Sequence, residues 1–206
     1  MASTSSSIPT TRYDVFLSFR GEDTRHTFTD HLYQALIEAG LCTFRDNDEI
    51  DRGEELKPEI ETAITRSRAS IVVLSKNYAN SRWCLDELCL ILDHKKECNH
   101  FVLPIFYQVD PSNVRNQRGS YAIRRSIRAA LTKGSIFTGF SNFLGTEAKE
   151  WSKWTKVNVR RWKEALTKVG NLSGMELSGW VSVDGDGRFK AMVLSIQTEK
   201  GFQDVA

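Results

Sequence analysis

The first 120 residues alternate between short apolar runs and segments in which apolar residues recur at helical spacing. The apolar runs, each of which predicts a buried strand, cover residues 13–19, 41–44, 69–74 and 101–107. The helical segments between them cover residues 27–39, 59–66 and 83–96. Strands that alternate with helices favour βαβ units, and therefore a parallel sheet covered by helices on both faces.

Glycine and proline add detail to this pattern. Gly40 fits the end of the first helix, and Pro58 fits the first turn of the second. Pro104 has no backbone N–H, so it predicts a position near a sheet edge or a strand end. The Asp-Pro-Ser sequence at 110–112 predicts a turn, and the charged residues 47–57 predict a loop because they lack periodicity.

The stretch after the apolar run 69–74 combines a helix start with candidate chemistry. Asn80 and Ser81 are residue types whose side chains cap helix N-termini. Trp83 and Glu87 are four residues apart and therefore share one helical face. They follow the C-terminal end of a strand, where open α/β sheets bind ligands. The spacing fits either a ligand site or a packed tryptophan beside a solvated glutamate.

Beyond residue 120 the pattern is less regular. Val159, Trp162, Leu166 and Val169 form a helical stripe. The other predicted elements are a basic helix, a loop rich in Gly, Ser and Phe, an edge strand and a last helix, at 122–133, 134–145, 179–183 and 188–200.

The chain has no internal repeat, and its 206 residues are enough for one domain with a substantial core. We expect this domain at residues 12–200, after a polar, disordered lead-in at 1–11 and before a short tail at 201–206. No apolar run approaches the roughly 20 residues of a membrane span. The four cysteines show no disulfide-scaffold spacing, so we expect reduced thiols inside a cell.

The net charge of +2 hides an asymmetry. Residues 115–168 carry 13 Lys and Arg against 3 Glu, a local balance of +10, so the remainder carries −8. Much of the acid lies between Glu22 and Glu61. The two parts are either solvated faces, surfaces that attract copies head to tail, or a basic part that meets a polyanion.

Several motifs in order resemble those of plant Toll/interleukin-receptor (TIR) domains. They are YDVFLSFRGEDTR at 13–25, TFRD at 43–46, RGEE at 52–55, SRWCLDEL at 81–88, LPIFY at 103–107, VDPS at 109–112 and RWKEAL at 161–166. The resemblance is close over about residues 12–120 and resumes at 161–166, whereas 134–158 is longer than in typical relatives. The resemblance implies an α/β, flavodoxin-like fold, with a five-stranded parallel sheet and helices on both faces.

The resemblance also implies a function. Such domains are NAD⁺ nucleosidases of plant innate immune and cell-death signalling, which cleave the nicotinamide–ribose bond when copies self-associate. NAD⁺ or NADP⁺ is then a substrate, no cofactor is implied, and the expected partners are further copies and other TIR proteins. We expect a cytoplasmic or nuclear location without a membrane. The sequence has no P-loop motif and no leucine repeat, so we read it as a TIR-only protein or the TIR part of an immune receptor.

Glu87 matches the family's catalytic glutamate. The resemblance places the substrate-binding residues around it, and these are Phe19, Arg20, Gly21, Ser81 and Trp83. Ser81 fits a helix cap as well as a ligand contact, and Arg20 fits a solvated strand end. Cys84 matches a cysteine tied to 2′,3′-cyclic nucleotide synthesis, although by itself it fits a small buried residue.

Two further regions match parts of the family that govern assembly. Arg52 and Gly53 lie in a loop that gates the pocket and inserts between copies, but Asp51 departs from the basic residue common there. That departure puts a preference for NADP⁺ in doubt. Asp30 and His31 match a self-association face, with Asp30 departing from the usual serine.

We predict no metal site, because the Cys and His residues at 84–100 do not have zinc-ligand spacing. Two alternative functions stay open. One is a non-catalytic TIR adaptor or scaffold. The other is a nucleic-acid-bound filament that makes 2′,3′-cyclic nucleotides, for which the basic segment is the independent hint.

Overall fold

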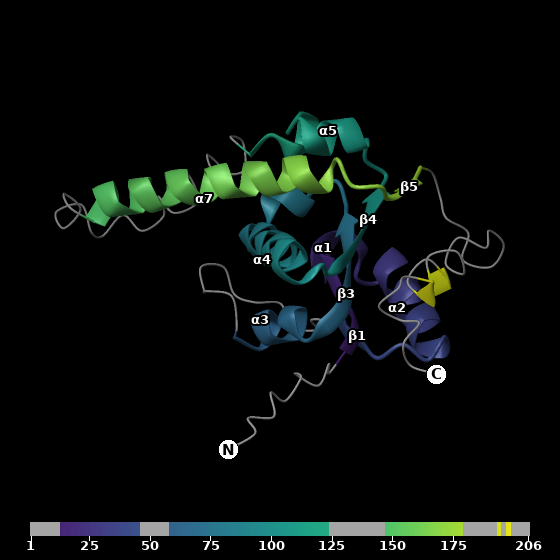
Figure 1. Ribbon diagram of the computed structural model, residues 1–206. Helices are drawn as coiled ribbons and strands as arrows, with labels where there is room; N and C mark the ends of the chain where they lie inside the picture. Colours follow the sequence, from purple (N-terminus) through teal and green to yellow (C-terminus); the bar gives the residue numbers. More distant parts are fainter. Residues whose placement is uncertain (1–12, 46–57, 124–146, 179–192, 195–196, 199–206) are drawn as a thin grey trace, which may run out of the picture.

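The computed structural model describes residues 13–45, 58–123, 147–178, 193–194 and 197–198, with the backbone alone at 147–156. Its centre is a parallel sheet in the order β2-β1-β3-β4-β5 (Figure 1). The strands are β1 (Tyr13–Phe19), β2 (Thr43–Arg45), β3 (Ser67–Leu74), β4 (Phe101–Tyr107) and β5 (Met175–Leu177). This order confirms the predicted flavodoxin-like fold with five parallel strands.

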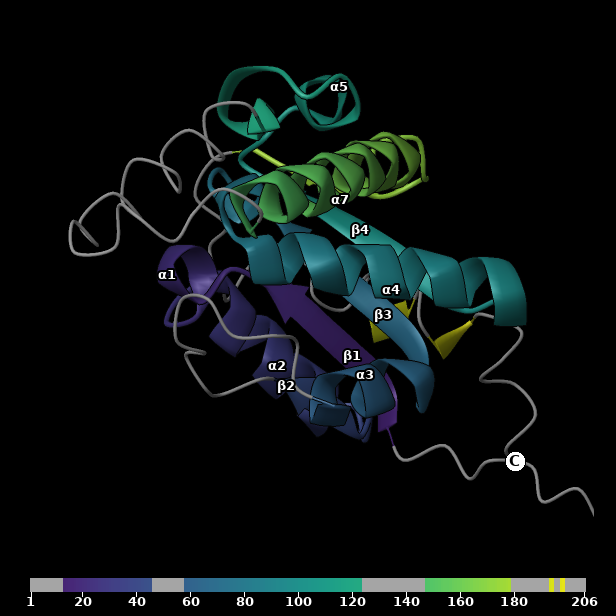
Figure 2. The same cartoon turned by 90° about the vertical axis from the view of Figure 1, so that its left-hand side faces the viewer.

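Helices cover both faces of the sheet (Figures 1 and 2). They are α1 (Gly21–Thr24), α2 (Phe28–Glu38), α3 (Pro58–Thr65), α4 (Arg82–Cys98), α5 (Pro111–Arg115) and α7 (Glu147–Val169), with short 3₁₀ turns η1 (Tyr78–Asn80) and η2 (Gly119–Tyr121). The predicted helices at 27–39, 59–66 and 83–96 are therefore confirmed within two residues at each end.

Alternation along each strand divides the core into two layers. In β1, Val15 and Leu17 pack with α2, whereas Phe16 packs with α3 and α4 on the other face. Figure 2 shows α4 in front of β1 and β3, with α7 alongside it. Ser18 follows the alternation of Phe16 and therefore lies on the α4 face of the sheet.

The helix α7 is joined to α4 by packing and by polar contacts. The predicted stripe is confirmed, since Trp162, Leu166 and Val169 are buried in the core layer beneath α4. The indole Nε1 of Trp162 donates to Asp86 Oδ1 (2.7 Å), and Arg161 pairs with Asp93 (2.6 Å). Figure 1 shows the N-terminal part of α7 extending beyond the other helices.

Three local predictions differ from the structure. The second strand begins at Thr43 rather than Leu41, because Gly40 (φ 82°) ends α2 and the Leu41 N–H still bonds to the Leu36 carbonyl. Asp110 is a helix cap rather than part of an isolated turn. Its carboxylate accepts from the Ser112 N–H (2.6 Å), and Pro111 is the first residue of α5.

The third difference lies near the edge of the sheet. Pro104 lies in the middle of β4 and pairs in register with Val72, but pairing with β5 starts one residue later at Ile105. The edge strand is β5, which the sequence did not predict at 175–177, and the predicted strand at 179–183 lies outside the described residues. Gly174 brings the chain against β4, because a Cβ there would lie 2.4 Å from the Pro104 carbonyl oxygen.

Other predictions concern residues outside the described part of the chain. They include the lead-in at 1–11, the loop at 47–57, the strand at 179–183, the tail at 201–206, and most of the helices at 122–133 and 188–200 and of the long insertion at 134–158. No helix among the described residues is long and apolar enough to cross a membrane.

Candidate active site

The candidate site lies at the C-terminal ends of β1 and β3. These strands run in register from Tyr13↔Ser67 to Phe19↔Val73, so they end together at one edge. The strand order reverses at β1, which makes this edge the topological switch point where flavodoxin-like folds bind ligands. The chain leaves β1 into α1 and leaves β3 into η1 and α4. Every predicted pocket residue in the described part lies at the end of β1 or on these connections.

Glu87 lies in the second turn of α4 and is only 7% exposed. Its carboxylate oxygen Oε2 accepts a hydrogen bond from the Ser18 hydroxyl of β1 (2.8 Å). A carboxylate is costly to bury unless polar partners stabilise it. Glu87 is therefore a buried carboxylate with a hydrogen-bond donor, and not the solvated helix residue that its position in the sequence also fitted.

Ser81 and Trp83 begin the helix that carries this acid. Ser81 is the N-cap of α4, and its side chain accepts from the Cys84 N–H (3.3 Å). The cap reading of Ser81 is confirmed, whereas Asn80 is the last residue of η1 and not the N-cap of α4. Trp83 is half-buried in the first turn, one turn before Glu87.

Phe19, Arg20 and Gly21 form the adjoining rim. The guanidinium of Arg25 lies over the Phe19 ring, 5.3 Å from its centroid. A Cβ at Gly21 would lie 2.9 Å from this guanidinium, so the flexible end of the Arg25 side chain would have to shift to admit one. Arg20 pairs with Glu22 and lies 3.7 Å from Asp23, which keeps its charge at the rim.

Asp23 is a residue that sequence reasoning did not assign. Its carboxylate accepts from the Ser75 hydroxyl (2.5 Å), the Asn77 N–H (2.8 Å) and the Asn77 side-chain amide (3.1 Å). These bonds join α1 to the end of β3. Asp23 therefore fixes the two sides of the switch point relative to each other.

Ser18 and Tyr78 were also missed. Ser18 is polar within an apolar strand, and Tyr78 lies in η1; both are fully buried. Their hydroxyl oxygens are 2.9 Å apart, and the Tyr78 hydroxyl also donates to the Cys84 carbonyl (2.9 Å). The available signal was a serine at an inward position of a predicted strand, which has to find a buried partner.

Cys84 is placed as a buried packing residue. Its thiol donates to the Phe19 carbonyl (3.5 Å), and burial, followed by the charge of Glu87, raises the pKa of this thiol far above its ordinary value. The thiol is therefore neutral at physiological pH, which disfavours a role as a thiolate nucleophile.

The predicted self-association residues lie at the other side of the sheet, on α2. Asp30 pairs with Arg45 of β2 (2.7 Å), and this hydrogen bond lowers the pKa of the Asp30 carboxyl. His31 is exposed. Arg52 and Gly53 of the predicted gating loop lie outside the described residues.

The His, Cys, Asp and Glu side chains in the described part of the chain form no group suited to a metal ion. A hollow of about 590 Å³ lies at the ends of β4 and β5, lined by Phe106, Gln108, Val109, Asp110, Glu176, Leu177 and Ser178. None of the predicted substrate residues lines it, and we give more weight to the buried acid at the switch point than to the size of this hollow.

Fold and site together define a flavodoxin-like α/β domain with a buried, hydrogen-bonded carboxylate at its switch point. A model of the TIR domain family matches residues 12–131. The chain therefore belongs to the TIR domain family, as the motifs predicted.

Curated relatives are plant disease resistance proteins. RPV1 of Vitis rotundifolia is 50% identical over 180 residues, which cover 85% of this chain and 11% of that protein. RUN1 of the same species is 50% identical over 175 residues, covering 83% and 11%. The TMV resistance protein N of Nicotiana glutinosa is 42% identical over 174 residues, covering 84% and 13%. The chain thus spans a small part of the length of these relatives.

A solved structure matches the fold as well. It contains the TIR domains of the activated Roq1 resistosome, which directly recognises the pathogen effector XopQ. That chain is 43% identical, with a TM-score of 0.65, and the match covers 89% of this chain and 99% of that one.

Proposed function

We propose that this chain is a self-association-dependent NAD⁺ nucleosidase of plant innate immune signalling, which cleaves the nicotinamide–ribose bond. The observation that carries the proposal is the burial of Glu87 at the switch point, with its carboxylate held by Ser18. The relationship to plant disease resistance proteins supports the immune role.

Cleavage of the nicotinamide–ribose bond requires few catalytic groups besides this carboxylate. The C1′–N bond breaks with its electron pair leaving on the nicotinamide nitrogen, which neutralises the cationic ring, so no general acid is needed. Water then forms the new C–O bond and releases a proton. A fixed carboxylate beside the ribose stabilises the oxocarbenium-like charge that develops as the bond breaks.

Two residues near Glu87 are suited to bind the base and the phosphate groups of such a substrate. The indole of Trp83 offers a face on which a base can stack, and Arg20 at the rim offers a guanidinium for phosphate. Arg20 is paired with Glu22, so a phosphate has to displace that contact. NAD⁺ or NADP⁺ enters as a substrate, and the proposal requires no cofactor.

The requirement for self-association rests on the loop of Arg52 and Gly53 and on the resistosome relative. In that relative TIR domains occur in an activated assembly, and we infer that here too a neighbouring copy orders the loop over the substrate. His31 is exposed and available for such a contact, whereas Asp30 is held by Arg45. The same domain without turnover would be an adaptor for other TIR proteins.

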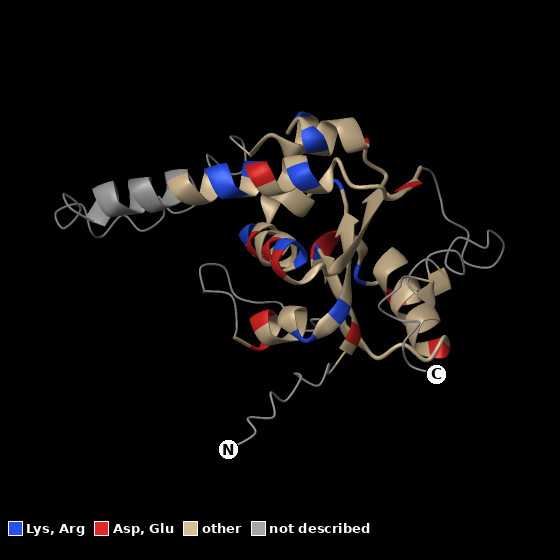
Figure 3. Cartoon of the chain, in the orientation of Figure 1, with Lys and Arg blue, Asp and Glu red and all other residues tan. Residues whose placement is uncertain are grey.

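The described part of α7 gives little support to the alternative function as a nucleic-acid-bound filament. Figure 3 shows Lys and Arg along this helix, but Arg160 pairs with Glu164 (2.9 Å) and Arg161 with Asp93. These pairs offset part of the positive charge that a phosphate backbone would meet.

The test measures nicotinamide released from NAD⁺ over a range of protein concentrations. We expect turnover that rises more steeply than protein concentration, and a loss of about 10²- to 10³-fold in Glu87→Ala. Glu97→Ala is the matched control, because Glu97 is an exposed glutamate on the same helix. Folded wild-type protein without turnover at any concentration would contradict the proposal and favour the adaptor.

A further inference from the structure

Three buried side chains from three different elements form one polar chain beneath the candidate site. They are Ser18 of β1, Tyr78 of η1 and Glu87 of α4, which are 0%, 0% and 7% exposed. Ser18 donates to Glu87, and its oxygen lies 2.9 Å from the Tyr78 hydroxyl. Tyr78 also reaches the Cys84 carbonyl, one turn before Glu87 on the same helix.

The number of hydroxyl protons determines which group donates in each hydrogen bond of this network. Two hydroxyl protons are available for three contacts, in which the Ser18 hydroxyl donates to Glu87 Oε2 and the Cys84 carbonyl can only accept. The Ser18 proton therefore goes to Glu87, and the Tyr78 proton is shared between Ser18 and the Cys84 carbonyl. Burial raises the pKa of Tyr78 well above its usual value, so this proton stays on the phenol.

We propose that Ser18 and Tyr78 are positioning residues that hold the carboxylate of Glu87 in its reactive orientation. Ser18 acts directly on the carboxylate, and Tyr78 acts through Ser18 and through the first turn of α4. A hydrogen bond to Oε2 restricts the direction in which the carboxylate points, and this is the preorganisation that a charge-stabilising group needs.

The role in catalysis rests on the proposed function, but the positioning itself does not. The carbon-13 shift of the Glu87 carboxyl, measured by NMR at neutral pH, reports its surroundings without any turnover. We expect this shift to move in Ser18→Ala and, by less, in Tyr78→Phe. A protein that shows these shifts but no wild-type turnover would refute the function and leave the positioning standing.

The kinetic test compares kcat and KM for nicotinamide release in Ser18→Ala, Ser18→Cys and Tyr78→Phe. Loss of a hydrogen bond to a charged group predicts a fall of about ten- to a hundredfold in kcat for Ser18→Ala, with KM nearly unchanged. Ser18→Cys keeps the volume and a weak donor, so its kcat lies between. Tyr78→Phe loses less than Ser18→Ala, because the direct donor to Glu87 remains.

Matched controls separate positioning from general destabilisation. Ser70 and Tyr121 are also fully buried, and their hydroxyls contact His100 (2.8 Å) and the Ser75 carbonyl (2.7 Å) rather than Glu87. Ser70→Ala and Tyr121→Phe should keep the kcat and the Glu87 carboxyl shift of the wild type. The proposal is overturned if Ser18→Ala leaves both readouts unchanged, or if Ser70→Ala changes them equally.

Discussion

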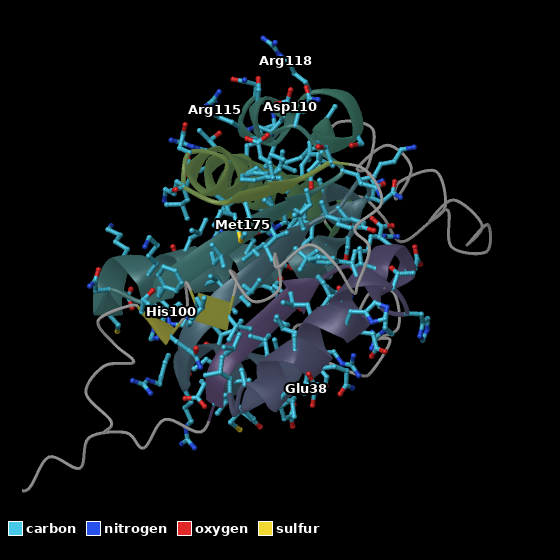
Figure 4. The ribbon with its side chains drawn as sticks, turned by 90° about the vertical axis from the view of Figure 1, so that its right-hand side faces the viewer. Glu38, His100, Asp110, Arg115, Arg118 and Met175 are labelled. Carbon is cyan, nitrogen blue, oxygen red and sulfur yellow. The ribbon has the colours of Figure 1, made fainter. Side chains whose placement is uncertain are left out.

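Two buried serines on the same face of the sheet, on the neighbouring strands β1 and β3, make similar contacts with titratable side chains. Ser18, near the C-terminal end of β1, donates to Glu87, and Ser70 of β3 bonds to Nε2 of His100, each at 2.8 Å. Both serines are fully buried, and the titratable partners are 7% and 5% exposed. In Figure 4, His100 and Asp110 mark the two ends of β4. One helix, α4, passes both pairs, since its His94 packs against His100 with ring centroids 4.9 Å apart.

The difference between the pairs lies in the topology rather than in the contact. Glu87 lies where β1 and β3 end and their connections diverge, which is the edge at which folds of this kind bind ligands. His100 lies at the start of β4, away from this edge, where a hydroxyl and an imidazole satisfy each other's hydrogen bonds. We therefore propose a role in function for the first pair and a role in stability for the second, and the following predictions test that division.

The largest effect on stability is expected at the functional edge. Asp23→Ala removes the acceptor of three hydrogen bonds that join α1 to the segment after β3, and the buried Ser75 hydroxyl and the part-buried amides of Asn77 lose this acceptor. We expect a loss of about 3 to 5 kcal/mol in unfolding free energy, or about 10 °C in Tm. Thermal and urea unfolding measure both quantities.

Asp93→Ala is the control for this substitution, because Asp93 forms a half-exposed ion pair with Arg161. Pairs of this kind contribute about 1 kcal/mol or less. If the two substitutions cost the same, Asp23 does not hold the switch point together.

A smaller effect on stability, which depends on pH, is expected at His100. Burial, and then the charges of His94 and Lys95 on α4, lower the pKa of His100 to about 4. The folded state therefore favours neutral His100. This contribution to stability is complete above the ordinary pKa near 6.5 and is lost as the pH falls from there through 4, by at most about 3 kcal/mol.

The measurement is the unfolding free energy of wild type and His100→Gln at several pH values. We expect the advantage of wild type to shrink between pH 7 and pH 4, while nicotinamide release at pH 7 stays equal in the two proteins. A constant advantage would show that His100 takes up its proton as readily in the fold as in the unfolded chain. A fall in turnover would place His100 in the site.

The sequence predicted the sheet well because its central strands are short, apolar and separated by helices of clear period. It predicted the edge poorly. The edge strand β5 has only three residues, and its position depends on the close approach of Gly174 to Pro104, which no periodicity reveals.

The motifs led to Glu87, but Ser18 and Ser70 look alike in the sequence, since each is one serine in an apolar strand. Their partners are 69 and 30 residues away, respectively. Such contacts follow from the strand order and the register, which local sequence does not specify. Asp23 was missed for the same reason, because its donors lie 52 and 54 residues further along the chain.

The most direct test of the account is a double-mutant cycle for nicotinamide release with Ser18→Ala and Glu87→Gln, at protein concentrations where the residual rate is measurable. If Ser18 acts through Glu87, Ser18→Ala lowers kcat by about ten- to a hundredfold in the wild-type background and has little further effect in Glu87→Gln. The same fold-change in both backgrounds would contradict the account, because the hydroxyl of Ser18 would then support the fold rather than the carboxylate.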